Sequence, residues 1–530
     1  MPHASTETPG IAPTPVTEPL ASPTRGQRAV RRTIAALGIV NVVVMAGYVA
    51  ASYGFARLAP FGTPEPIEAR AFDRLADAVA PAGSAVHAFL RGDTALADPS
   101  AFFNVYASFL LVPSIVFVAL LAVLSRRREA LNDPLARSLF RWAAAFAVVL
   151  AFAHPVLVQD FWLSAGWGRL IARGVNPYYV NLDPQVTAGL PLDYLGLLMT
   201  YGPLWALVAG AVMAVAGAGP FVAGLLFKAS LACAWIGALA LVAHLLRTRP
   251  AADRCVGMAI AGWLPLGAFQ IVAEGHNDVG MVLLLLLWLA LLERGRHLAG
   301  TVSLAASVLV KYLSAPLFLL DLLHTIRSRG KRWTAYLPYA AAAALLGLVV
   351  FGIFFRSPAF FASTAHMADW HFFTPRDGVV TTGRLLGIEP SLGSLGGMLV
   401  AALAIGVQGF FLLLLAYGVW RYWRTPAPES FRYAVLTMTA GILFGVVGHI
   451  WPWFLAWGLV IAALHPASAI TRWTTGVALA VPFPLVHWTA FPGPDQLVIV
   501  TPAMYLFAVA WFLLAPRRWF GTDKAAAHCS

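Results

Sequence analysis

Long runs of apolar residues, separated by short polar or basic segments, recur along the chain from residue 33 onward. An apolar run of about 18 or more residues can cross a bilayer, and within the hydrocarbon a helix satisfies its own backbone groups. The pattern predicts an all-α polytopic membrane protein with about 14 transmembrane helices. The expected spans are 33–55, 102–124, 140–158, 220–245, 255–272, 279–292, 298–310, 312–325 and 335–355, with the remainder between 395 and 516.

The basic residues cluster in short segments between these runs, which is the pattern of loops that stay on the cytoplasmic side. Both ends of the chain are therefore expected in the cytoplasm. Residues 1–30 are rich in Pro, Thr, Ala and Ser, which predicts a disordered tail. The expected organisation is this tail, a membrane domain at 31–516, and a second cytoplasmic tail at 517–530.

One apolar segment, 195–217, has two interpretations. It opens with Tyr201-Gly202-Pro203, and it either spans the membrane or re-enters from the side on which it began. We favour re-entry, because Arg247, Arg249 and Arg254 then fall on the cytoplasmic side with the other basic clusters. An amphipathic helix in the external interface is expected just before it, at 160–173.

Composition agrees with a membrane protein, since 59% of residues are hydrophobic, 11% are charged and the mean hydropathy is +0.74. A net charge of +12 on a soluble chain would suggest a nucleic acid partner. Here the positive charge is explained by the basic loops between the spans. Membrane lipid is therefore an expected partner, and nucleic acid is not. No phosphate-binding loop or dinucleotide fingerprint is present, which argues against a nucleotide-sugar donor.

Polar side chains near the membrane are candidates for function, because they are costly there. On the expected topology they gather outside. Asp160 begins the predicted interface helix and is either its N-terminal cap or a general base. The cluster Glu274, His276, Asn277 and Asp278 is either a polar turn that caps the next span or a patch that binds a hydroxylated substrate.

The other candidates are cations and groups that could line a binding site. Lys311 lies within an apolar stretch and either extends to the interface or binds a lipid phosphate. Arg376 and Arg384, in the loop 356–394, are candidates for the same phosphate. The remaining expected substrate-binding residues are Arg169, Asn176, Tyr178, Tyr179 and His449. No cofactor or metal site is expected, and a divalent metal is left open, because His276 and Asp278 alone do not form a coordination shell.

Several segments resemble the GT-C superfamily of polytopic glycosyltransferases, most closely the polyprenol-phosphate-mannose-dependent mannosyltransferases and glycosyltransferase family 87. The segments are an Asp after an early span followed by "WGRLIARGVNPYY", then "YGPLW", "GWLPLGAFQIVAEGHNDVGMVLLLLLWLALLERGR" and "LVKYLSAPL". The likeness covers most of residues 140–465.

This resemblance implies a GT-C-like fold, a polyprenyl-phosphate sugar as donor, and a catalytic Asp on the external face of the cell membrane. That role falls on Asp160. The expected reaction moves a hexose, mannose foremost, to a glycan or glycolipid acceptor of the cell envelope, with inversion at the anomeric carbon. The alternatives are a transporter or flippase of lipid-linked sugars and a polymerase or ligase that uses a larger lipid-linked donor.

Overall fold

The computed structural model describes residues 22–58, 99–157, 160–188, 190, 196–217, 219–328, 332–368, 372–490 and 494–521. Within these ranges the chain is helical, and the β-pairing recorded is one isolated bridge between Phe372 and His449. The all-α class is confirmed for this part of the chain. Most of the N-terminal tail, most of the loop 57–101 and most of the C-terminal tail lie outside the described residues.

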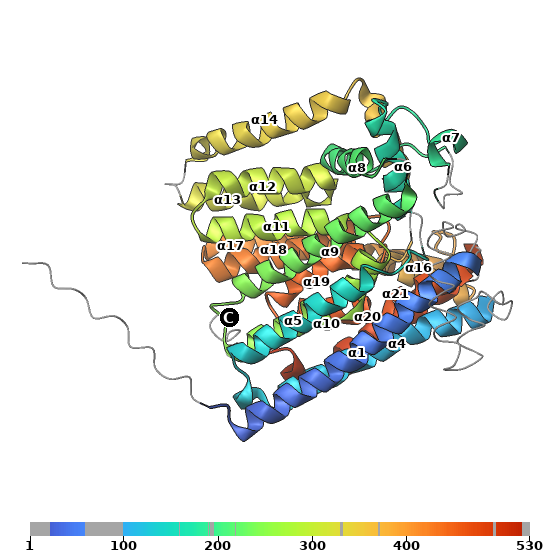
Figure 1. Cartoon of the computed structure of the whole chain (residues 1–530). Helices are drawn as coiled ribbons and strands as arrows, with labels where there is room; N and C mark the ends of the chain where they lie inside the picture. Colours follow the sequence, from blue (N-terminus) through green and yellow to red (C-terminus); the bar gives the residue numbers. More distant parts are fainter. Residues whose placement is uncertain are drawn as a thin grey trace, which may run out of the picture.

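The main helices lie side by side in a bundle (Figure 1). Its interior is filled by large side chains such as Trp167, Trp235, Trp263, Trp288 and Trp457. The helices of the bundle are α1 (Arg25–Leu58), α4 (Pro99–Arg126), α5 (Asp133–Leu150), α9 (Pro220–Leu245), α10 (Ala251–Trp263), α11 (Asp278–Glu293), α12 (His297–Val310), α13 (Phe318–Ser328), α14 (Leu337–Phe354), α17 (Leu395–Arg424), α18 (Pro428–Gly441), α19 (Phe454–Ala463), α20 (Ala469–Ala480), α21 (Pro482–Ala490) and α22 (Pro494–Leu514).

Shorter helices and single turns connect or cover these elements. Two are π-helices, η4 (Gly267–Ala273) and η8 (Ile442–Val446), in which the backbone is wound more loosely than in an α-helix. The others are α6 (Asp160–Ala172), α7 (Pro184–Thr187), α8 (Pro203–Ala216), α15 (Ala362–Ala368), α16 (Pro375–Leu385) and the 3₁₀ turns η3 (Arg128–Ala130), η5 (Tyr312–Leu317), η6 (Trp333–Tyr336), η7 (Pro358–Phe361) and η9 (Arg517–Trp519).

Five of the described helices are long and apolar enough to cross a membrane, or six if α10 and η4, bent by 41° at their junction, form one span. Their outward faces carry exposed apolar side chains, as at Leu345 on α14 and Leu413 on α17, which suits contact with lipid. The chain is thus a multi-pass membrane protein, and the figure of about 14 spans remains a prediction.

Ion pairs gather several basic helix ends at one end of the bundle. Arg128 lies 3.7 Å from Asp253, and Arg254 pairs with Asp133. Arg249 pairs with Glu429 as well. These contacts join the ends of α4, α5, α10 and α18. Arg249 and Arg254 therefore lie on the same side as the Arg126–Arg128 cluster, as re-entry of the segment 195–217 requires.

The direction of α8 agrees with this arrangement. Figure 1 shows α8 nearly along its axis, whereas α9, α11 and α12 run across the view. Its first residues lie against the end of α12, where Gly202 N–H donates to the Val310 carbonyl at 3.0 Å. A Cβ on Gly202 would meet the Leu309 carbonyl oxygen at 2.1 Å, so the close approach requires glycine.

Two local expectations were wrong. The helix predicted at 140–158 ends at Leu150, and residues 151–157 continue without regular helix toward Asp160. The helix predicted at 160–173 does form, as α6, but it is not amphipathic. Every residue from Phe161 to Leu170 is buried, because α6 is covered by α8 and neighbouring segments instead of lying with one face in water.

Candidate active site

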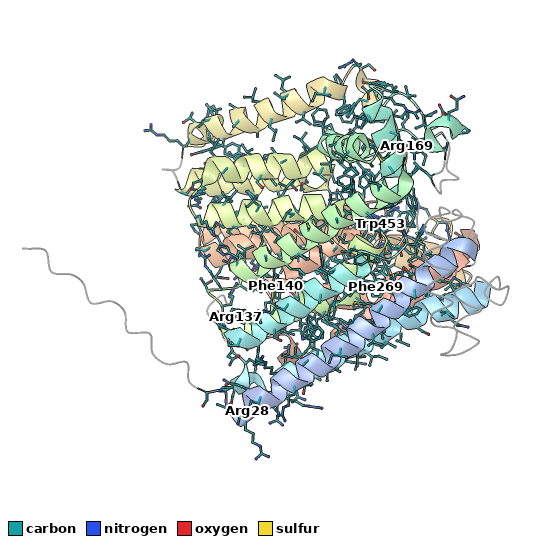
Figure 2. All side chains as sticks on the ribbon, viewed as in Figure 1. Arg28, Arg137, Phe140, Arg169, Phe269 and Trp453 are labelled. Atoms are coloured by element: carbon teal, nitrogen blue, oxygen red, sulfur yellow. The ribbon has the colours of Figure 1, made fainter. Side chains whose placement is uncertain are left out.

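Three side chains meet at the start of α6, which lies at the end of the bundle away from Arg28 and Arg137 (Figures 1 and 2). The Tyr201 hydroxyl donates to Asp160 Oδ2 at 2.9 Å, and Nδ1 of His276 lies 3.5 Å from the same oxygen. His276 is fully buried, while the Asp160 side chain keeps 27% of its surface exposed. The carboxylate is therefore held on one oxygen and is still partly accessible to solvent.

The surroundings of Asp160 keep its carboxylate ionised. Burial acts to raise its pKa, but the neighbouring His276 imidazole, the Tyr201 hydroxyl and the charge of Lys311 act the other way. The balance lowers the pKa below its ordinary value of 3.8. Asp160 can thus accept a proton at neutral pH without first having to lose one.

A buried ion pair lies beside this group. Lys311 Nζ donates to both oxygens of Asp278, at 2.8 and 2.9 Å, and the Asp278 side chain is inaccessible to solvent. The ammonium also lies over the Phe454 ring at 4.1 Å from its centroid and over the Tyr201 ring at 5.7 Å. Two of the three ammonium protons are used by Asp278, which leaves one for a ligand.

Tyr201 joins the two halves of the site, because its hydroxyl binds Asp160 while its ring faces Lys311. Burial raises the pKa of Tyr201 well above its ordinary value, and the charges of Asp160 and Asp278 raise it further. The phenol therefore remains a hydrogen-bond donor to Asp160.

The turn that carries His276 and Asp278 has a local cause. Gly275 adopts φ +83°, and a Cβ there would lie 2.3 Å from Cδ2 of Phe161, so a larger residue would be strained in conformation and would clash. The π-helix η4 ends directly before this turn, and η8 ends shortly before the segment His449–Trp453. Such helices are common at functional sites because they shift the register of the side chains that follow.

Aromatic rings fix the plane of His276. Its imidazole stacks on Trp453 with centroids 3.7 Å apart and planes 13° apart, and Trp453 stacks in turn on Trp451 at 4.8 Å and 8°. Phe372 meets Trp451 edge-on at 4.7 Å. The ladder connects the turn after η4 with the segment after η8 and with the chain before α16.

Glu274 is directed away from Asp160. Its Oε1 accepts hydrogen bonds from Tyr48 at 2.6 Å and Tyr106 at 2.8 Å, and its Oε2 accepts from the N–H groups of Val156 and Leu157 at 2.9 and 2.8 Å. Four donors satisfy this carboxylate, which is fully buried. Glu274 thus ties α1, α4 and the segment before Asp160 to the turn.

The turn Asn176–Tyr179 anchors the chain around α14 and the segment after it. Asn176 Nδ2 donates to the Phe354 carbonyl at 2.6 Å, and the Tyr179 hydroxyl contacts the backbone of Arg356 and Ser357. Tyr178 donates to the Tyr201 carbonyl at 2.7 Å. The last bond connects this turn with the residue that holds Asp160.

The other expected residues differ in position. Arg169 is buried and donates to the carbonyls of Val186 and Ala188, so it holds the α7 segment. His449 lies beside Phe454, the ring under Lys311, with centroids 5.7 Å apart. Arg376 is exposed on α16, and Arg384, on the same helix, binds Glu389 at 3.2 Å. Three further polar residues of the loop 356–394, His366, Asp369 and His371, have no described side chains.

Sequence reasoning did not select Tyr201, Trp453 or Lys228. In the sequence, Tyr201 stands only at the start of an apolar segment, and Trp453 lies in an aromatic segment that is typical of a membrane interface. Lys228 is a cation eight residues after the start of an expected span, 220–245, and that signal alone could have marked it. Among the described residues no group of three or more His, Cys, Asp or Glu side chains is arranged to hold a metal ion.

Comparison with known proteins bears on this cluster. Residues 75–324 match the family model of the alpha-(1->6)-mannopyranosyltransferase N-terminal domain. The chain resembles the mannosyltransferases. The expected likeness is thereby confirmed, and the matched segment contains Asp160, Tyr201, His276, Asp278 and Lys311.

A curated relative gives the same result. Alpha-(1->6)-mannopyranosyltransferase A of Mycobacterium tuberculosis is 28% identical over 218 residues. The match spans 38% of this chain and 41% of the relative, which is less than half of each. The chain spans less than half of this relative, so the relative's activity comes to this chain only as a proposal.

Proposed function

We propose that this protein is a mannosyltransferase that moves mannose from a polyprenyl-phosphate donor to a cell-envelope glycan or glycolipid. One observation carries the proposal. An ionised, partly exposed carboxylate, Asp160, is fixed by Tyr201 and His276 beside the Lys311–Asp278 pair, inside the segment that matches the mannosyltransferase model. The cluster combines a base with a cation, which is what this transfer needs.

The proposed reaction is one displacement at the anomeric carbon. An acceptor hydroxyl oxygen bonds to that carbon as the bond to the lipid phosphate oxygen breaks, and the hydroxyl proton passes to Asp160. The leaving group is a polyprenyl phosphate monoester. A single displacement inverts the configuration, so an α-linked product, as the relative's name describes, requires a β-linked donor.

Charge on the departing phosphate must be met by cations or N–H donors. Lys311 is the proposed partner, since it has one ammonium proton left after Asp278 takes two. The exposed Arg376 is a second candidate. Arg384 ranks below it because Glu389 already binds its guanidinium.

The sugar and acceptor are proposed to contact the turn after η4. Asn277 is 3% exposed, and its side-chain amide has no hydrogen-bond partner in the described part of the chain. A buried amide without partners is unfavourable, so hydroxyl groups of a substrate would satisfy it. The Asn176–Tyr179 turn and His449 would form the surrounding wall.

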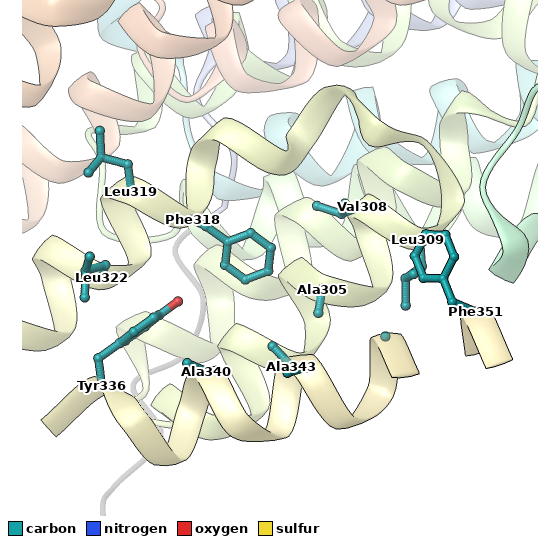
Figure 3. A pocket seen from close by; sticks show the side chains of 12 residues that line it. Ala305, Val308, Leu309, Phe318, Leu319, Leu322, Tyr336, Ala340, Ala343 and Phe351 are labelled. Carbon is teal, nitrogen blue, oxygen red and sulfur yellow. The ribbon is translucent and has the colours of Figure 1, made fainter. Parts of the chain in front are cut away.

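The donor's hydrocarbon chain has a proposed place between α12, α13 and α14. A groove of about 490 Å³ lies there and is lined almost entirely by apolar side chains. Figure 3 shows the side chains that line it. Its lining includes Ala305, Leu309, Ala343, Gly347 and Phe351. Leu309 is two residues from Lys311, so a lipid whose phosphate binds Lys311 could lay its chain along the groove.

The reaction is proposed to take place on the external face of the cell membrane, because the basic helix ends lie at the other end of the bundle. A lipid-bound donor cannot leave that surface, so a fixed base at the membrane boundary suits it.

The test uses the full-length protein in lipid nanodiscs with radiolabelled polyprenyl-phosphate mannose and a mannose oligosaccharide as acceptor. We expect a labelled product one hexose longer, and linkage analysis identifies the bond. Transfer from a nucleotide-linked mannose should not occur. Movement of the labelled lipid across proteoliposomes without product would instead indicate the flippase and overturn the proposal.

A further inference from the structure

A buried lysine lies outside the catalytic cluster. Lys228 is on α9, within a candidate membrane span, and only 4% of its surface is exposed. An ammonium group is costly in such a place unless polar partners surround it. The proposed reaction makes no use of Lys228, so its buried position needs another physical reason.

The partners of Lys228 are the last carbonyls of η4. Its Nζ donates to the Val272 carbonyl at 2.8 Å and to the Ala273 carbonyl. These oxygens lie at the C-terminal end of a helix, where carbonyls lack partners within the helix and the dipole is negative. The turn that carries His276 and Asp278 begins one residue later.

The same ammonium also faces the helix that begins with Asp160. Lys228 Nζ lies 5.1 Å from the centroid of the Phe161 ring, and Gly275 packs against that ring so closely that a Cβ would lie 2.3 Å from it. Phe161 is the neighbour of Asp160. Lys228 therefore contacts both segments whose separation sets the distance between Asp160 and His276.

We propose that Lys228 is a positioning residue, which holds the end of η4 against Phe161 and so keeps His276 beside Asp160. This inference rests on the proposed function, in which Asp160 is the base. Without the ammonium, the end of η4 would lose these two hydrogen bonds, and the turn that follows it would move away from α6. A displacement of about 1 Å at a reacting group can lower turnover as much as 100-fold.

Two variants separate position from mere stability. Lys228→Met keeps the length and apolar stem but removes the donors, and Lys228→Arg keeps the charge and donors. Ser230→Ala is the control, since Ser230 is exposed on the same helix and its hydroxyl donates to the Leu226 carbonyl within that helix. We expect Lys228→Met to lower kcat about 10- to 100-fold, with KM for the donor little changed, and Lys228→Arg to recover part of the loss.

The pH profile provides a readout that a purely structural role would not move. If His276 moves away, the pKa of Asp160 rises, so the acidic limb of kcat should shift to higher pH in Lys228→Met. A wild-type limb and wild-type kcat in that variant would overturn the inference, while an inactive wild type would overturn the proposed function instead.

A measurement that needs no substrate tests the role of Lys228 separately from the proposed function. Diethyl pyrocarbonate labels accessible imidazoles, and peptide mass spectrometry locates the label. His276 is inaccessible in the structure and should be protected in the wild type, in Lys228→Arg and in Ser230→Ala. It should become labelled in Lys228→Met, while His297, buried at the start of α12, stays protected. Protection of His276 in Lys228→Met would show that Lys228 does not hold the turn.

Discussion

At the scale of single residues, a substitution can distinguish the proposed role of Asp160 as a base from that of a helix cap. Asp160→Asn keeps an oxygen that can accept from Tyr201, so the fold should survive, while the proton acceptor is lost. We expect turnover to fall about 10²-fold or more, measured with the labelled donor. Asp183→Asn, which alters the acid that caps α7, should leave activity near wild type. Near-full activity of Asp160→Asn would leave Asp160 as a helix cap, with Asp278 as the next candidate base.

The role of Lys311 in donor binding can be measured only if Asp278 is substituted in the same variant. Lys311→Met alone leaves Asp278 buried and unpaired, and breaking such a pair destabilises by roughly 3–5 kcal/mol. Lys311→Met with Asp278→Asn removes both charges, so thermal unfolding in detergent should return toward wild type. We expect KM for the donor to be higher than in the wild type in Lys311→Met and to remain higher in the double variant. A wild-type KM there would mean that Lys311 serves only to pair Asp278.

At the scale of elements, the groove beside α14 provides a test of donor binding. Gly347 lines the groove and Gly352 does not, and a Cβ on either meets no atom within 4 Å. Gly347→Leu should fill the groove and raise KM for a long-chain donor about tenfold, which corresponds to about two methylene groups displaced. It should not affect a donor with a short chain. Gly352→Leu is the matched control, and equal effects of both variants, or on both donors, would contradict the assignment.

The elements also show what sequence could and could not predict. Apolar runs located most of the helices, and the break at Lys311 was expected and is present between α12 and η5. The π-helix η4 was not expected, because a continuous apolar run carries no sign of a change in winding. The burial of α6 on all sides was not expected either. Its arginine suggested a solvated face, whereas the carbonyls of Val186 and Ala188 satisfy Arg169 in the interior.

At the scale of the whole molecule, the pattern of basic residues predicted which helix ends lie together, while sidedness remains a prediction. The basic helix ends do meet at one end of the bundle, as at Arg254 and Asp133. Which polar groups would meet at the other end was only partly visible in the sequence. Glu274 and Asp278 are four residues apart, yet one binds tyrosines of α1 and α4 and the other binds Lys311, because contacts between distant segments decide where each side chain points.

The external position of the site can be tested with impermeant thiol reagents on intact cells. The native cysteines at 233, 255 and 529 are first replaced by serine. Single cysteines are then placed at Arg376, exposed on α16, and at Arg127, exposed at the basic end of the bundle. We expect labelling at 376 in intact cells and at 127 only after permeabilisation, because clustered arginines stay in the cytoplasm. The reverse pattern would place Asp160 on the cytoplasmic side, and the donor would then have to be used from the inner leaflet.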